Sequence, residues 1–132
     1  MHEPLVCAYM GDVIYEKYVR EYLINQGISK VGELQNRSLE YVSANSQRKH
    51  LERLLDCSYF TDEEIDIIKW GRNAKGTKSK STDIITYRLA TGLETLIGKL
   101  YFDKKYDRIE EIMKNILGEK IWKYMEEMFL MN

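Results

Sequence analysis

Residues 82–102 read TDIITYRLATGLETLIGKLYF and predict one long helix that begins at Thr82 or Asp83 and ends at Phe102. Apolar residues recur every three or four positions, which is the period of an α-helix and not of a β-strand. Glu94 lies at the edge of the apolar face, between Gly92 and Gly98. That face is expected to pack in the core and consists of Ile85, Leu89, Leu93, Leu96, Ile97 and Leu100.

The rest of the chain has the same helical period, and no segment alternates convincingly as a strand would. Few chain breaks are expected, because there is one proline in 132 residues. We therefore predict an all-α fold, a helical bundle in a single domain over residues 1–132, with 105–132 as a C-terminal helical extension. The further predicted helices are 5–26, which stops at Gly27; 33–55, bent or broken near Val42–Ser43; a helix from the capping box Thr61-Asp62-Glu63-Glu64 to Gly71; 103–117; and 119–131.

Composition and charge exclude several classes of protein. The chain is 44% hydrophobic and 31% charged, which is typical of a folded domain and not of a disordered chain. The formal net charge of −1 excludes a strongly basic coat for nucleic acid, so a polyanion site needs local clustering of cations. Cys7 and Cys57 are far apart in sequence and indicate reduced thiols. With no leader pattern and no membrane-spanning run, we expect a cytoplasmic protein without a membrane partner.

Two carboxylates occur where the pattern calls for apolar residues. Asp12 falls on the apolar face of the predicted helix 5–26, among Leu5, Ala8, Tyr15, Val19 and Leu23. Glu94 has the corresponding place in the long helix. A carboxylate on such a face needs a cap, an ion pair or a cation, and the pattern leaves open whether each acid pairs with an Arg or Lys or both hold one Mg²⁺. Glu16, one turn after Asp12, is a weaker candidate for a supporting role.

A basic stretch precedes the long helix. Residues 67–82 contain five basic side chains and no acid. This composition suits a loop laid along phosphates, although a solvated charged loop is the commoner explanation. His50 alone does not predict a metal cluster. The candidate RNA-binding residues are Arg72, Asn73, Lys75, Lys78 and Lys80 in and beside this stretch, Arg88 in the long helix, and Arg37, Gln47 and Lys49 in the second helical segment.

Four blocks of the sequence together resemble Mini-ribonuclease III, the small bacterial member of the ribonuclease III family that lacks a double-stranded-RNA-binding domain. The blocks are AYMGDVIYEKYVRE (8–21), RSLEYVSANSQ (37–47), FTDEEIDIIKWGRNAK (60–75) and TDIITYRLATGLETLIGKLYF (82–102). The resemblance implies a ribonuclease III endonuclease-domain fold, a homodimer, and Asp12 and Glu94 as the catalytic metal ligands. Full-length ribonuclease III carries further acids where this chain has Ala8 and Thr91, so Thr91 is a second weak supporting candidate beside Glu16.

The resemblance also implies a reaction and partners. These are Mg²⁺-dependent hydrolysis of double-stranded RNA by an activated water, with Mn²⁺ as a substitute metal and 5′-phosphate and 3′-hydroxyl products. The implied substrate is precursor 23S ribosomal RNA, with a large-subunit ribosomal protein as a further partner. Two alternatives stay open at this point: a catalytically silent relative that binds double-stranded RNA, and a helical module that binds other proteins.

Overall fold

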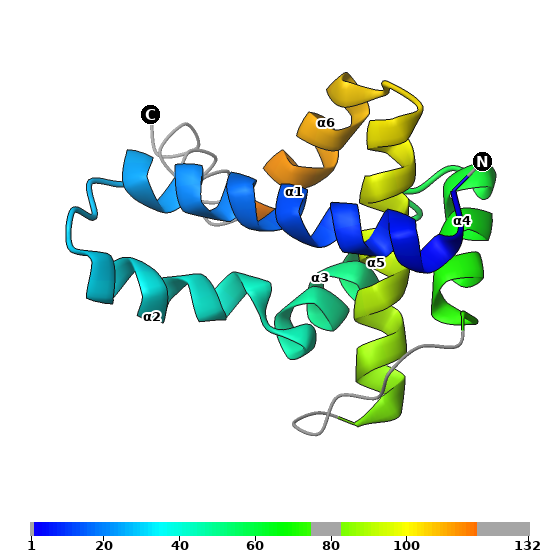
Figure 1. Ribbon diagram of the computed structural model, residues 1–132, viewed down its shortest axis with the longest axis horizontal. Coiled ribbons are helices and arrows are strands. Elements are labelled where there is room, and N and C mark those ends of the chain that lie inside the picture. Colours follow the sequence, from blue (N-terminus) through cyan, green and yellow to red (C-terminus); the bar gives the residue numbers. More distant parts are fainter. Residues whose placement is uncertain (1, 75–82, 119–132) are drawn as a thin grey trace, which may run out of the picture.

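Six α-helices make up the part of the chain that the computed structural model describes, residues 2–74 and 83–118, and these residues contain no strand. Figure 1 shows α5 running across α1, with α2 alongside α1 and with α3 and α4 beside α5. The all-α prediction is confirmed. The helices are α1 (Pro4–Asn25), α2 (Val31–Val42), α3 (Ala44–Asp56), α4 (Asp62–Arg72), α5 (Ile84–Phe102) and α6 (Tyr106–Leu117).

Local sequence signals set most of the helix ends. Ser43 is extended, ends α2 and caps α3, so the predicted break near Val42–Ser43 is present. The capping box at Thr61 forms both of its hydrogen bonds, and Asp83 caps α5 through the amide of Thr86. Gly27 has a φ of +90°, as expected of a residue that follows a helix.

One predicted helix begins later than expected, and another lies outside the described residues. The helix predicted from Asp103 begins only at Tyr106, because Asp103 caps α5 and Lys104 has a left-handed φ of +60°. The chain needs these residues to reverse direction between α5 and α6. The helix predicted over 119–131 lies outside the described residues. Within residues 2–74 and 83–118, no helix has both the length and the apolar character needed to cross a bilayer.

The core forms around α5, which is buried over most of its length against α1, α3 and α4. Leu93, Leu96 and Ile97 are fully buried, as the apolar pattern predicts. Ile85 is 61% exposed, so its predicted core position is wrong. The reason is visible in Figure 1, where the first turns of α5 extend past the helices that cover the rest of it. Leu5 and Leu89 are only half-buried.

Two glycines allow α1 and α5 to cross in direct backbone contact. A Cβ atom at Gly11 would overlap the carbonyl oxygen of Glu94, and one at Gly98 would overlap the carbonyl oxygen of Cys7. Only glycine permits such a close approach between two helices. Gly11 precedes Asp12 in α1, and its contact on α5 is the backbone of Glu94 itself. The crossing therefore brings the two acidic residues together.

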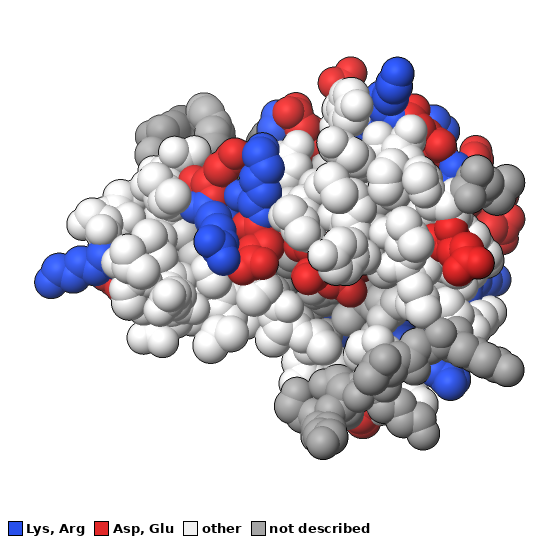
Figure 2. Space-filling view, viewed as in Figure 1, with Lys and Arg blue, Asp and Glu red and all other residues white. Residues whose placement is uncertain are grey.

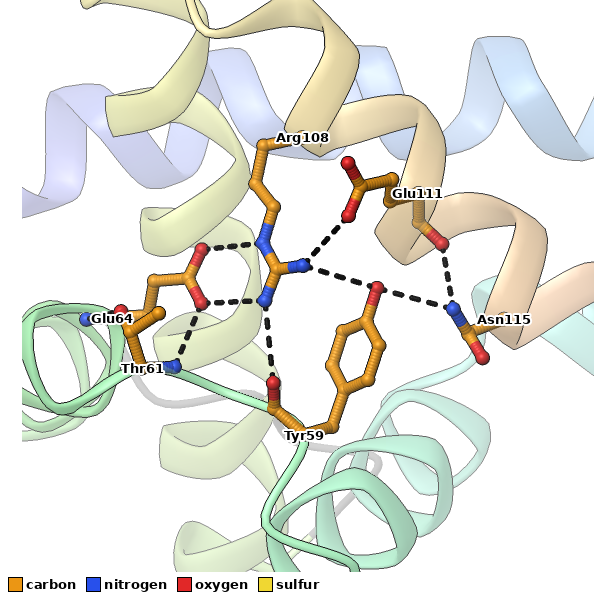
Figure 3. Close-up of polar contacts among 6 residues, drawn as sticks. All are labelled: Tyr59, Thr61, Glu64, Arg108, Glu111 and Asn115. Carbon is orange, nitrogen blue, oxygen red and sulfur yellow. Dashed lines mark hydrogen bonds and ion pairs between the residues drawn. The ribbon is translucent and has the colours of Figure 1, made fainter.

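A buried ion pair ties α6 to α4 and to the loop before it (Figure 3). Arg108 donates from Nε and Nη2 to the two carboxylate oxygens of Glu64, with both distances 2.8 Å. The Arg108 guanidinium also lies over the ring of Tyr59, 4.6 Å from its centroid, and Nη2 donates to the Tyr59 carbonyl. Glu64 accepts from the amide of Thr61 as part of the capping box. One arginine thus joins three segments of the chain.

We expect Arg108→Met to lower the free energy of unfolding by about 3 kcal/mol, because it leaves the Glu64 carboxylate buried without its cation. The Glu64 side chain is only 8% exposed. The measurement is urea unfolding at pH 7. Arg20→Met is the matched control, since Arg20 pairs with Glu16 on an exposed face of α1 and the loss there should stay below about 0.5 kcal/mol.

The ion pair between Arg108 and Glu64 also predicts how the free energy of unfolding depends on pH. Burial raises the pKa of Glu64, but hydrogen bonds from Arg108 and Thr61 outweigh burial and hold that pKa below its ordinary value. A lowered pKa in the folded state adds stability that is fully present above the ordinary glutamate pKa of about 4.3. This stability is lost as the pH falls through the folded-state pKa. The difference between the wild type and Arg108→Met should therefore shrink from pH 7 to pH 3, and an unchanged difference would contradict this account.

Candidate active site

A hollow of about 370 Å³ opens where α1, α5 and the α2–α3 junction meet. We call it the acid hollow, because Asp12 from α1 and Glu94 from α5 both line it. The other lining residues come from two segments. They are Val42, Ser43, Ala44, Asn45 and Gln47 at the α2–α3 junction, and Tyr87, Ala90 and Thr91 on α5.

Asp12 and Glu94 are brought together although 82 positions separate them in sequence. Their side chains are within hydrogen-bonding reach of each other. Glu94 is half-buried, whereas Asp12 is exposed. The prediction that Asp12 is buried within the apolar face of its helix is therefore wrong. The buried face of α1 includes Cys7, Gly11, Ile14 and Tyr15. Asp12 lies at the margin of this face, and its side chain lines the hollow.

The close approach of Asp12 strongly perturbs the ionisation of Glu94. Burial raises the pKa of Glu94 to about 9, together with the hydrogen bond to Asp12 and the negative charge of Asp12; a hydrogen bond from Gln47 acts in the opposite direction. Two carboxyl groups this close cannot both carry a full charge without compensation. A proton or a bound cation supplies that compensation.

Gln47, on α3, lines the acid hollow together with this pair. Its side chain is buried, with 2% of the residue exposed. Nε2 donates to the carbonyl oxygen of Val42 at 3.2 Å, and the Gln47 side chain acts on Glu94 to lower its pKa. Oε1 is buried and has no hydrogen-bond partner within residues 2–74 and 83–118. As a buried residue, Gln47 has no open surface to offer to RNA, which was its predicted role.

Tyr15, on α1, holds the end of α2 in place next to the acid hollow. Its hydroxyl donates to the carbonyl oxygen of Tyr41 at 2.8 Å. Burial raises the pKa of Tyr15, and the charge of Glu94 adds to the shift. The sequence pattern placed Tyr15 among the apolar residues and gave no sign that its hydroxyl has a partner.

The two weaker candidates are placed differently. Thr91 lines the hollow, but its hydroxyl donates to the Tyr87 carbonyl oxygen of its own helix at 2.9 Å. Glu16 does not line the hollow. It pairs with Arg20 at 2.8 Å and lies at a separate groove between α1 and α2. A supporting role for Glu16 at the acid pair therefore has no contact behind it.

The candidate RNA-binding side chains are distributed over four helices and their ends. Lys49 on α3 and Arg88 on α5 are exposed. Arg37 on α2 is exposed and lies 3.7 Å from Glu40. Arg72 ends α4 and donates to the side chain of Asn73. Lys75, Lys78 and Lys80 lie outside the described residues.

The donor set suits a hard divalent cation. The oxygens that line the hollow include the carboxylates of Asp12 and Glu94 and the unpartnered amide oxygen of Gln47, and oxygen is the ligand type that Mg²⁺ selects. Within residues 2–74 and 83–118, no group of three or more His, Cys, Asp or Glu side chains is arranged to hold a metal. With so few protein ligands, an Mg²⁺ ion here would keep several waters and take further oxygens from its substrate.

Known proteins resemble this chain both in sequence and in structure. Residues 5–105 match the family model of the ribonuclease III domain. The chain is 47% identical over 115 residues to Mini-ribonuclease 3 of Staphylococcus aureus, which covers 86% of each protein. It is also 47% identical over 94 residues to Mini-ribonuclease 3 of Desulfitobacterium hafniense, or 71% of this chain and 59% of that one. The crystal structure of protein FN1578 from Fusobacterium nucleatum superposes with a TM-score of 0.80 at 27% identity, over 90% of this chain and 94% of that one.

Proposed function

Because this chain belongs to the ribonuclease III family, and within it to the Mini-ribonuclease III group, we propose that it is an Mg²⁺-dependent endoribonuclease that cuts double-stranded RNA at the acid hollow. The observation that carries the proposal is the meeting of Asp12 and Glu94 at the α1–α5 crossing. A pair of adjacent carboxylates beside an open hollow can hold a cation where a phosphate group can reach it.

Asp12 and Glu94 have distinct parts in this proposal. The exposed Asp12 and the half-buried Glu94 would hold the ion, and Gln47 would position the Glu94 carboxyl group. When bound, Mg²⁺ lowers the pKa of a water and polarises the scissile phosphate, so that hydrolysis leaves a 5′-phosphate and a 3′-hydroxyl. The residues that line the hollow include no Ser–His or Cys–His pair that would make a protein nucleophile.

Recognition of the RNA is proposed to depend on shape and phosphates. A-form RNA hides its base edges in a deep major groove, so the contacts available are to phosphates and 2′-hydroxyls. The side chains proposed to make them are Arg37, Lys49, Arg72, Asn73 and Arg88, together with Lys75, Lys78 and Lys80. With a formal net charge of −1, the affinity should be modest and should fall steeply with salt.

We also propose that the protein acts as a homodimer. Val6, Tyr9 and Val13 are spaced to share one face of α1, and all three are exposed, Tyr9 to 80%. Figure 2 shows that the side chains over the N-terminal half of α1 are mostly uncharged. An apolar face of this kind is typical of a contact between proteins. Sedimentation velocity should show a dimer that Tyr9→Lys converts to a folded monomer, and a monomeric wild type would contradict the proposal.

By analogy with the Mini-ribonuclease III group, the proposed biological substrate is precursor 23S ribosomal RNA in the cytoplasm. A large-subunit ribosomal protein is the proposed additional partner, since a protein that presents the RNA would add to the modest affinity expected of a chain with a formal net charge of −1. The whole of residues 1–132 is proposed to act as one catalytic domain.

The test is to incubate the protein with a long, perfect RNA duplex, with Mg²⁺, with Mn²⁺ or with EDTA, and to analyse the ends of the products. We expect cleavage with either metal, none with EDTA, and 5′-phosphate ends. A DNA duplex of the same sequence is the control and should stay intact. Salt-dependent binding without cleavage at any metal concentration would instead indicate a catalytically silent relative, and cleavage in EDTA would contradict the metal-dependent mechanism.

A further inference from the structure

Gln47 is the one buried amide that lines the acid hollow, and the catalytic proposal leaves its oxygen unused. Nε2 donates to the Val42 carbonyl oxygen, and the Gln47 amide lies close enough to Glu94 to act against the rise in its pKa. Oε1 is as deeply buried but has no partner among the described residues. Leaving a buried acceptor unsatisfied costs about 1–3 kcal/mol, so a residue kept in this state needs an explanation.

Helix capping explains only half of the arrangement. The Val42 carbonyl is at the end of α2, where carbonyl groups lack partners within the helix. Nε2 of Gln47 satisfies it, one turn into α3. This role requires a donor but gives no reason to bury Oε1 without a partner in a residue that lines the acid hollow. An acceptor at this place has a use when a hydrated cation occupies the hollow, because the ion and its waters then offer positive charge and donors to it.

We propose that Gln47 is a positioning residue of the metal site: Nε2 orients the Glu94 carboxylate, and Oε1 serves as the neutral oxygen that faces the hydrated ion. The inference rests on the proposed function, since it assumes that the acid hollow holds a divalent cation. Oε1 of Gln47 supplies a third oxygen donor at a place where the described residues provide only two carboxylates. A neutral donor strengthens the site without adding a third negative charge to an acid pair that already repels itself.

The test measures the affinity of the RNA-free protein for Mn²⁺ by electron paramagnetic resonance. Gln47→Met removes both polar atoms while keeping the length and volume of the side chain. We expect Mn²⁺ to bind it about tenfold more weakly or worse, which is the usual effect of losing a group that orients a metal ligand. Gln35→Met is the matched control, the same change on an exposed position of α2, and should leave the Mn²⁺ affinity unchanged.

Thermal unfolding in EDTA separates this role from a purely structural one. Gln47→Met should melt within a few degrees of the wild type in EDTA, yet gain less stability from added Mn²⁺. Should Gln47→Met fail to fold, Gln47→Asn carries the test, because the shorter amide cannot reach Glu94 and is expected to weaken Mn²⁺ binding as well. An unchanged Mn²⁺ affinity in whichever of these variants folds would overturn the inference.

Asp12→Asn, measured alongside, distinguishes the two proposals. If Mn²⁺ binds the wild type and Asp12→Asn equally, or does not bind the wild type, the proposed metal site is wrong and the role of Gln47 is wrong with it. If Asp12→Asn weakens binding and the Gln47 variants do not, the proposed function stands and only the role of Gln47 is lost.

Discussion

Asp12→Asn and Glu94→Gln are each expected to lower cleavage of an RNA duplex by about a thousandfold or more. Both changes keep the size of the side chain and remove one of the two negative charges that hold the cation. Metal catalysis contributes several kcal/mol to the stabilisation of the transition state. A loss of about 4 kcal/mol corresponds to about three powers of ten in rate. The measurement is single-turnover cleavage at saturating protein and fixed Mg²⁺.

The same variants should not lose folding stability, and this separates a catalytic role from a structural one. The two acids lie close together and repel each other when both are charged. Removing one charge relieves that repulsion, so the melting temperature in EDTA should be unchanged or higher. Glu21→Gln is the control on the same helix, since Glu21 forms an exposed pair with Lys17, and should cleave like the wild type. Cleavage at the wild-type rate by either acid variant would contradict the assignment.

Local signals in the sequence predicted most of the helix ends of the described residues. Helix ends at Ser43, Thr61 and Asp83 depend on side-chain caps that lie within three residues of the groups they satisfy. Such contacts are legible in the sequence because they need no knowledge of the tertiary structure. The errors occur where tertiary structure decides: Ile85 matches the apolar period but lies beyond the helices that would cover it.

The candidate site was predictable in part, for a related reason. Asp12 and Glu94 break an apolar pattern, and that irregularity identified both as candidates. Periodicity could not show that Asp12 stays exposed, because its exposure depends on the angle at which α1 crosses α5. Periodicity also could not show the role proposed for Gln47, because that role depends on interactions with Glu94 and with the end of α2. In sequence, Gln47 is one polar residue among several in a polar helix.

Gly11→Ala is expected to lower the free energy of unfolding by about 3 kcal/mol or more and to abolish cleavage in whatever protein still folds. Overpacking a core usually costs about 1–3 kcal/mol. The cost here should be at the upper end, because the atom that the new methyl group would overlap is the backbone carbonyl oxygen of Glu94, which cannot rotate away. Cleavage should fail as well, since separating α1 from α5 moves Asp12 away from Glu94.

Gly32→Ala is the control that gives this prediction its direction. Gly32 is in the first turn of α2, and a Cβ there would meet nothing within 4 Å. Alanine is favoured over glycine inside helices by up to about 1 kcal/mol, so Gly32→Ala should be neutral or stabilising in urea unfolding. If Gly11→Ala lowers the free energy of unfolding and Gly32→Ala does not, the requirement for glycine lies at the α1–α5 crossing. A Gly11→Ala protein as stable and as active as the wild type would show that the two helices can separate without cost, and that the acid pair does not depend on their contact.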